Sequence, residues 1–230
     1  MINAGGFMAC HRFVSHITGF GTQMGINFAR SEFLIALEML LIPIAFILGT
    51  IISAYLIDAR QLNNKKARPD FVLFIITVIL FLVAFLGESG TFGIFGEAQI
   101  EKKDYILISL LCLVTGMQNA CVSSLTKNAL RASHLTGIAT DFGINFVKLR
   151  QLDNHSKEKI IEKKWNRIRF FNMFFFSVGS FVAVFIFSKF SYLGFMAPLI
   201  NSLIFLGLYF RAQRKLKLKE TDYLKEFTHA

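Results

Sequence analysis

Five long apolar stretches divide the chain, and each of them contains no Asp, Glu, Lys or Arg. They comprise Met39–Ile57, Phe71–Gly87, Tyr105–Thr126, Phe170–Ser188 and Phe190–Phe210, and their lengths run from 17 to 22 residues. A helix of about 20 apolar residues, rising ~1.5 Å per residue, crosses the ~30 Å hydrocarbon core of a bilayer. The pattern therefore predicts a polytopic membrane protein. It excludes a soluble globular domain, a disordered chain and a disulfide-stapled secreted scaffold.

Membrane helices are expected over Phe33–Ile57, Phe71–Gly87, Tyr105–Cys121, Phe170–Ser188 and Tyr192–Phe210. Glu38 and Pro43 lie inside the first of these, and Pro43 predicts a kink because proline removes a backbone hydrogen bond and crowds the preceding turn. The polar segment Arg150–Arg169 has apolar residues at helical spacing around Trp165. Two readings of that segment stand side by side, an amphipathic helix on the leaflet surface and a solvated loop helix.

Charge is scarce but unevenly placed along the 230 residues, of which 17% are Asp, Glu, Lys or Arg. Lys and Arg gather in Asp58–Asp70, Val147–Arg169 and Arg211–Ala230, whereas Glu88–Asp104 holds four acids and two lysines. Basic connections of membrane proteins stay on the cytoplasmic side. The three basic segments, and with them the C-terminus, are therefore expected in the cytoplasm and the acidic segment outside.

A polar segment occurs twice, which is the most informative feature of the sequence. Ser15–Phe28 and Ser133–Phe146 share the pattern S-H-[IL]-T-G-x-x-T-x-x-G-I-N-F, with nine of fourteen positions identical. Just upstream, Asn3-Ala4 corresponds to Asn119-Ala120. We call these two copies the first and second motif. They predict that the chain is an internal duplication.

The duplication predicts an all-α bundle of about six helices, built from two inverted three-helix repeats. The repeats cover residues 1–87 and 105–210, with the external acidic loop at 88–104 between them and the basic cytoplasmic tail at 211–230. Three helices per repeat force the two repeats into opposite orientations, and this topology puts every basic segment on one side. The counterpart of Tyr105–Cys121 is expected before Asn3, so we expect the first helix to be truncated in this sequence. Inverted repeats with a site between them are a recurring transporter design.

The motif residues have the chemistry of a polar pathway. The side chains expected to line it are Ser15, His16, Thr18, Thr22, Asn119, Ser133, His134, Thr136, Thr140 and Asp141, while Gly19, Gly25, Gly137 and Gly143 are expected to allow close backbone approach. Thr18 and Thr136 are expected to cap a half-helix, whose N-terminus favours an anion. If transport is proton-linked, Asp141 is the best carrier and the histidines come next, because acids in membrane segments mark pathways. The competing reading is structural, with the glycines packing broken helices and the polar side chains satisfying freed backbone groups.

The sequence holds no nucleotide-binding or hydrolase motif and no nucleic-acid module. The three cysteines (Cys10, Cys112 and Cys121) lie at no metal-ligand spacing, and the two motif histidines have no carboxylate at ligand spacing beside them. We therefore expect no catalytic residue, no cofactor, no metal ion and no nucleic-acid partner. The expected partners are membrane lipids and a small polar or anionic solute, and a homo-oligomer remains open.

Several short segments resemble the YoaK-like family of bacterial multi-pass membrane proteins, a domain of unknown function. They are Asn3-Ala4-Gly5-Gly6-Phe7, Ser15-His16-Ile17-Thr18-Gly19, Gly116-Met117-Gln118-Asn119-Ala120 and Leu135-Thr136-Gly137, and the resemblance runs from Met1 to about Phe210. It implies a bacterial inner (plasma) membrane location and about six helices. It implies no activity.

The function expected from these observations is a small-solute transporter or channel-like permease, with its pathway between the two motifs. The alternative is a non-transporting accessory or structural membrane protein that binds a partner or lipid through the basic segments. An intramembrane enzyme is the least favoured class, because Ser133 beside His134 in sequence does not establish a nucleophile–base pair.

Overall fold

The computed structural model describes residues 1–97, 102–127, 130, 133–154 and 156–228. Its elements, in chain order, are α1 (Ile2–Cys10), α2 (Ile17–Ala29), α3 (Phe33–Glu38), α4 (Leu41–Leu62), α5 (Pro69–Glu88), α6 (Lys102–Leu125), α7 (Leu135–Gln151), α8 (Lys157–Phe190), the 3-10 helix η1 (Ser191–Phe195) and α9 (Met196–Thr228). The all-α class predicted from the sequence is confirmed.

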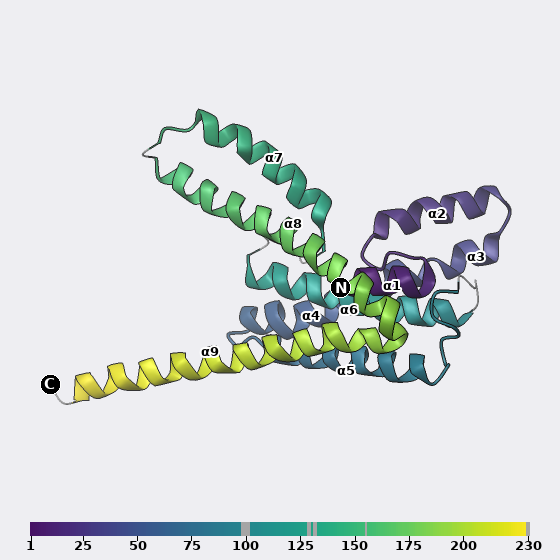
Figure 1. The fold of residues 1–230 in the computed structure, drawn as a ribbon. Helices are drawn as coiled ribbons and strands as arrows, with labels where there is room; N and C mark the ends of the chain where they lie inside the picture. The colour runs from purple at the N-terminus through teal and green to yellow at the C-terminus, as the bar shows by residue number, and fades with distance from the viewer. Residues whose placement is uncertain (98–101, 128–129, 131–132, 155, 229–230) are drawn as a thin grey trace.

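Helices α4, α5, α6 and α9 lie side by side in a bundle, with α4 packed on α6 and α5 on α9 (Figure 1). Four described segments are long and apolar enough to cross a membrane, namely Phe33–Leu62, Pro69–Glu88, Asp104–Leu125 and Lys157–Leu216. The last of these contains both α8 and α9, between which the chain reverses at η1 (Figure 1). The protein is thus a helical membrane protein, and each of the five predicted spans has a counterpart in a helix.

The predicted helix limits differ from the observed ones mainly where polar residues extend a helix. The third span was expected over Tyr105–Cys121, but α6 runs from Lys102 to Leu125. The last was expected to begin at Tyr192, but η1 occupies that turn and α9 starts at Met196. The segment 211–230, expected as a tail, continues α9 as far as Thr228. The expected loop 88–104 is described as far as Glu97, and its residues 98–101 lie outside the described residues.

The kink predicted for the first long helix is present as a break between α3 and α4 at Met39 and Leu40. Pro43 has no N–H to donate to the Met39 carbonyl, which lies four residues earlier, and its ring crowds that turn. The Met39 carbonyl instead accepts from the N–H of Ile42 at 3.4 Å, a three-residue spacing. Pro43 therefore accounts for the position at which the regular helical hydrogen-bond pattern is interrupted.

The segment Arg150–Arg169 does not form a helix of its own. The chain turns after α7, and α8 then runs without interruption from Lys157 through the apolar span to Phe190. Ser156 caps its start, with its hydroxyl accepting from the N–H of Lys159 at 3.1 Å. Lys157–Arg169 is therefore the N-terminal part of the long helix α8, and α8 packs against α7.

A close backbone contact joins α4 to α6 through two glycines. A Cβ on Gly49 would lie 2.1 Å from the Leu113 carbonyl oxygen, and one on Gly116 would lie 2.2 Å from the Phe46 carbonyl oxygen. Both clashes are with backbone, which cannot swing aside as a side chain can. Lipid provides no hydrophobic force between helices, so membrane helices associate through close packing. Small residues such as glycine allow that packing.

At the opposite end of α8, the Phe187 ring is enclosed by two other glycines. A Cβ on Gly5 of α1 or on Gly194 of η1 would fall within 2.5 Å of that ring, and Phe187 is fully buried. The loop after α5 covers this end of the bundle. Its Phe92 carbonyl accepts from the Tyr192 hydroxyl at 3.3 Å, and its Gly96 carbonyl lies 3.0 Å from His11 Nε2.

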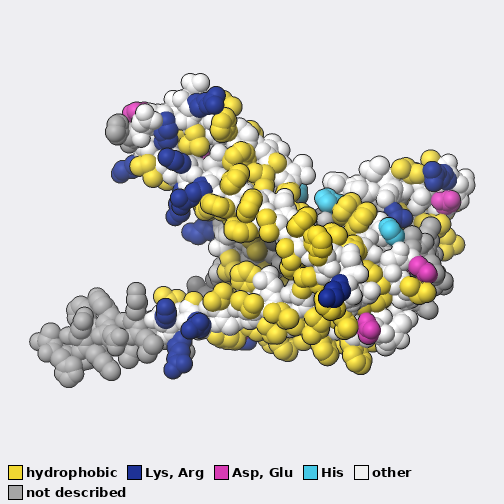
Figure 2. All heavy atoms as spheres, viewed as in Figure 1, with side chains coloured by type: hydrophobic (Ala, Val, Ile, Leu, Met, Phe, Trp, Pro, Cys, Tyr) yellow, Lys and Arg dark blue, Asp and Glu magenta, His cyan; other side chains and the backbone are white. Residues whose placement is uncertain are grey.

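Charge is segregated along the length of the bundle. In Figure 2 the Lys and Arg side chains gather on the left, over the hairpin of α7 and α8 and beside the far end of α9, while most of the acidic side chains in this view lie on the right. Apolar side chains cover the surface between them. The distribution matches a band of lipid contact with one basic margin.

Replacing Gly49 with alanine will force α4 and α6 apart, and overpacking of this kind typically costs about 1–3 kcal/mol. Gly25→Ala on α2 is the matched control, because a Cβ there meets nothing within 4 Å. Thermal unfolding of the purified variants in detergent will show a lower melting temperature for Gly49→Ala and an unchanged or slightly raised one for Gly25→Ala. Equal melting temperatures for Gly49→Ala and the parent would contradict the close contact.

Candidate functional site

The two motifs have the same local structure. In each, an irregular segment leads to a histidine at the N-cap position, and a helix follows: α2 after His16 and α7 after His134. The backbone angles of the two histidines agree closely, at φ −99°, ψ 72° for His16 and φ −90°, ψ 63° for His134. The sequence repeat is therefore also a repeat of local conformation, and the predicted loop-to-half-helix arrangement is found in both copies.

Helix α6 holds the start of both motifs. The Thr115 hydroxyl donates to the carbonyl of Val14, immediately before the first motif, at 3.1 Å. One turn further along α6, Asn119 makes two hydrogen bonds to Ser133: its Nδ2 donates to the serine hydroxyl at 2.7 Å, and its Oδ1 accepts from the serine N–H at 2.8 Å. Residues four apart on a helix are neighbours on one face. The beginnings of the two motifs are therefore attached about one helical turn apart.

The asparagine that precedes each motif has the same role in both copies. In the first, Asn3 Oδ1 accepts from the N–H of Ser15 at 3.2 Å, which repeats the contact between Asn119 and Ser133. The copies differ in the serine hydroxyl. The hydroxyl of Ser133 is paired with Asn119, whereas that of Ser15 is buried and has no hydrogen-bond partner among the described residues. A buried hydroxyl without a partner costs about 1–3 kcal/mol, so the first motif has a polar group that a ligand or water would satisfy.

Thr18 and Thr136 do not cap their helices, contrary to expectation. The N-cap positions belong to His16 and His134, and neither histidine makes a side-chain capping bond. The threonines lie inside the first turn, and their carbonyls accept from the hydroxyls of Thr22 at 3.2 Å and Thr140 at 2.9 Å. All four threonines are exposed. The first-turn N–H groups of α2 and α7 consequently have no side-chain cap.

The motif glycines are not at helix contacts within the described chain. A Cβ on Gly19, Gly25 or Gly143 would meet nothing within 4 Å. Gly137 is different, because a Cβ there would lie 2.8 Å from Nδ1 of His134, whose ring folds over the first turn of α7. Among these four glycines, only Gly137 has a close neighbour in the described chain, and that neighbour is a side-chain ring and not another backbone.

The two histidine rings, although equivalent in sequence, have different neighbours. His134 lies against Gly137, whereas His16 packs edge-on against Phe13 with ring centroids 5.0 Å apart. Both side chains are exposed. The copies also differ in the residue at the position of Asp141 and in its contacts. Its counterpart Gln23 accepts a hydrogen bond from Arg12 Nη1, while Asp141 lies exposed on α7.

The structure thus brings the starts of the motifs together and lets their helices diverge. Figure 1 shows α2 and α7 leaving the middle of the molecule in opposite directions, each pairing with the next helix, α3 or α8. Ser15, Asn119 and Ser133 lie at the convergent end. The residues further along, such as Gly25 and Gly143, lie on the diverging arms.

Sequence reasoning missed Thr115, Cys112 and Arg12. Cys112 donates its thiol to the same Val14 carbonyl as Thr115, at 3.1 Å. One signal was available, since Thr115 lies four residues before Asn119 in the uncharged stretch Tyr105–Thr126 and so shares its face. In the part of the chain that the structure describes, no three His, Cys, Asp or Glu side chains are grouped as metal ligands. The three cysteines are buried free thiols.

The family model described as "Protein of unknown function (DUF1275)" matches residues 1–209, so the chain belongs to this family. The match agrees with the YoaK-like resemblance of the motifs. Searches of curated proteins and of solved structures found no match.

Removing the side chain of Asn119 will leave the Ser133 N–H and hydroxyl without their partner, and each buried group left unpaired costs about 1–3 kcal/mol. Asn119→Ala will therefore lower the melting temperature in detergent. It will also speed hydrogen exchange of amides at the start of α7. Asn201→Ala is the control, because Asn201 is an exposed asparagine on α9. Exchange at α7 that stays as slow in Asn119→Ala as in the control would show that this contact does not hold the second motif.

Proposed function

We propose that this protein is a small-solute transporter or channel-like permease, whose pathway runs between the two motifs and admits a small polar or anionic solute. The supporting observation is the attachment of both motif starts to one face of α6, through Thr115 and Asn119. Two broken, polar segments that meet at mid-helix of a central membrane span resemble the discontinuous helices that form substrate sites in transporters. No catalytic step is part of this proposal.

Electrostatics favour an anionic or polar solute at the meeting point. Helices α2 and α7 both begin near this meeting point, and neither first turn is capped by the side chain of its N-cap residue. A helix N-terminus carries roughly half a positive charge and presents free N–H groups. Arg12, half-buried beside α2, adds a full positive charge to the same region.

Several polar side chains of the motif helices are exposed, which supports a water-accessible pathway. Thr18 and Thr22 on α2, and Thr136, Thr140 and Asp141 on α7, are exposed. Polar and acidic groups within membrane segments usually face a cavity or a partner, because lipid exposure is costly. If transport is coupled to protons, Asp141 is the carrier and the histidines are next in line.

The topology that goes with this proposal is a pair of inverted three-helix repeats in the bacterial inner membrane, with the C-terminus in the cytoplasm. The equivalent bonds Asn3–Ser15 and Asn119–Ser133 support the repeat. The gathering of Lys and Arg at one end of the bundle supports the orientation (Figure 2).

The alternative is a non-transporting accessory protein that binds a partner or a lipid through its basic segments. It is favoured by the cluster of cations on α7 and α8. The two functions predict opposite effects of the same substitutions. An accessory protein tolerates alanine at His134 and Asp141 but not charge reversal within Lys157–Arg169, whereas a transporter behaves in the opposite way.

Uptake by proteoliposomes tests the proposal. The purified protein, reconstituted in lipid vesicles, will be offered isotope-labelled phosphate, sulfate, small carboxylates and neutral polyols. We expect uptake of at least one of them above protein-free vesicles. His134→Ala will reduce this uptake about tenfold or more, because a hydrogen bond to a charged group is worth about 1.5–3 kcal/mol. Asp141→Asn will reduce proton-coupled uptake, because an asparagine side chain cannot carry the proton.

Asp153→Asn is the matched control, since it removes an exposed acid just beyond the end of α7 and will leave uptake unchanged. Correctly folded protein that takes up none of these solutes would favour the accessory role. Uptake that survives both motif substitutions would place the pathway elsewhere in the bundle.

A further inference from the structure

A cavity of about 500 Å³ lies at the basic end of the bundle, between the start of α5 and the last apolar turns of α9. Three cationic side chains and one carboxylate line it: Lys66, Arg68, Arg214 and Asp70. The aromatic rings of Tyr209 and Phe210 complete much of its wall. This cavity is separate from the motifs and plays no part in the proposed pathway.

The position of the cavity along the membrane normal is fixed by the sequence on both of its helices. The apolar run of α9 ends at Phe210 and is followed by Arg211 and Arg214, while the apolar run of α5 begins at Phe71, directly after Asp70. The two helices are antiparallel neighbours, joined by the hydrogen bond from the Thr77 hydroxyl to the Ser202 hydroxyl at 3.0 Å. Both therefore change from apolar to charged at the same level, which is the level of lipid headgroups.

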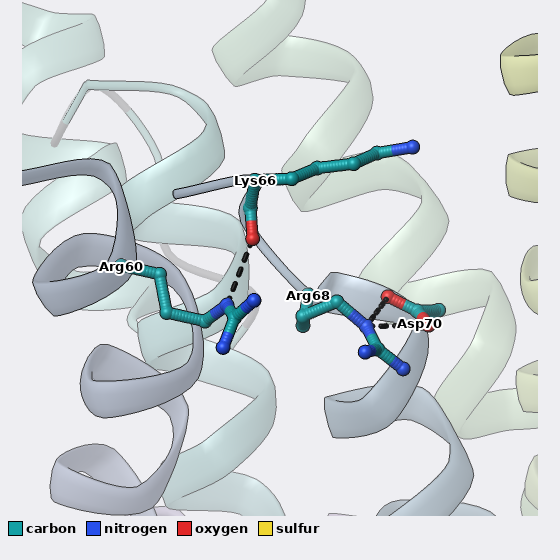
Figure 3. A network of polar contacts seen from close by, with 4 residues as sticks. All are labelled: Arg60, Lys66, Arg68 and Asp70. Carbon is teal, nitrogen blue, oxygen red and sulfur yellow. Dashed lines mark hydrogen bonds and ion pairs between the residues drawn. The ribbon is translucent and has the colours of Figure 1, made fainter. Parts of the chain in front are cut away.

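The charges in the cavity are only partly satisfied by one another. Arg68 uses Nε to hold both oxygens of Asp70, at 3.1 and 3.0 Å, and its terminal nitrogens point away from that carboxylate (Figure 3). The Lys66 carbonyl accepts from Nε of Arg60 at 2.8 Å, which fixes the connecting loop, while the Lys66 ammonium lies apart from both arginines (Figure 3). Three cations against one anion leave an excess positive charge that an anion would neutralise. Asp70 keeps Arg68 in place.

The apolar surface beside the cavity suits acyl chains. Phe71 and Phe74 of α5 are 45% and 52% exposed, and Phe205 and Leu208 of α9 are 55% and 52% exposed. These side chains lie on the membrane side of the cations. A ligand that combines a phosphate with long hydrocarbon chains would contact both surfaces, whereas free phosphate would contact only the first.

We propose that this cavity is a binding site for the phosphate headgroup of an anionic glycerophospholipid, with its acyl chains lying along the exposed faces of α5 and α9. Lys66, Arg68 and Arg214 contact the phosphate, and Asp70 positions Arg68. Each Lys or Arg near an anionic membrane surface contributes about 1 kcal/mol to lipid attraction. Two cations removed together should therefore weaken binding of the lipid roughly tenfold or more.

The test measures binding of phosphatidylglycerol and phosphatidylcholine of matched chains to the full-length protein in detergent, by native mass spectrometry and by the rise in melting temperature. The double variant Lys66→Gln/Arg214→Gln removes two cavity cations. Lys65→Gln/Lys215→Gln removes two neighbouring exposed cations that do not line the cavity, so both variants change the net charge equally. Asp70 and Arg68 stay intact in both, which protects the fold.

We expect the parent and the control to retain phosphatidylglycerol in preference to phosphatidylcholine, and the cavity variant to lose that preference by about tenfold. Equal losses in both double variants would overturn the site, because binding would then follow net charge alone. Inorganic phosphate that stabilises the parent as much as phosphatidylglycerol would overturn the lipid assignment and leave a free-anion site. Solute uptake by the cavity variant in vesicles of neutral lipid will match the parent, so the outcome is independent of the proposed function.

Discussion

The contact between α4 and α6 is the constraint on which the rest of the structure depends. Gly49 and Gly116 let two backbones touch, and the helices are then fixed in rotation as well as in distance. That rotation decides which face of α6 points to the motifs. Because Thr115 and Asn119 share this face, one helix packed tightly on one side holds two irregular segments on the other. Any loosening at the glycines would shift both motif starts together.

Irregular backbone in a membrane is stable only where its polar groups are paired inside the protein. Both motif starts meet this requirement by the same means, an asparagine that accepts from a serine N–H. In the second motif both the N–H and the hydroxyl of Ser133 are paired, and the first has a buried Ser15 hydroxyl without a partner among the described residues. Two copies of one sequence pattern thus have one architecture and unequal chemistry. Gln23 and Asp141, at equivalent positions, also differ in their contacts, since Gln23 is hydrogen-bonded to Arg12 and Asp141 is exposed.

Much of the fold could be predicted because a segment that crosses lipid must be apolar and must pair its own backbone polar groups. Stretches without charge have to be helices, and Pro43 has to interrupt one. The repeat predicted a helix in each motif, and both copies do have the same local conformation. Contacts between distant segments were harder to foresee. That Gly49 meets Leu113, or that Thr115 reaches Val14, depends on how helices rotate against one another, and periodicity along one helix contains no such information. The same limit explains why Gly19, Gly25 and Gly143 were expected to pack closely and meet nothing within 4 Å among the described residues.

The unbroken hydrogen-bond ladder of α8 gives the molecule a stiff rod. At ~1.5 Å per residue, a helix of this length is about 50 Å long, well beyond the ~30 Å hydrocarbon layer. A continuous helix moves largely as one rigid body. Tilting its lysine-rich end against α7 would swing the Phe187 ring between Gly5 and Gly194, and Gly5 belongs to the short helix whose Asn3 holds Ser15. The lysine-rich start of α8 and the first motif are therefore connected through a continuous series of contacts within α8 and α1.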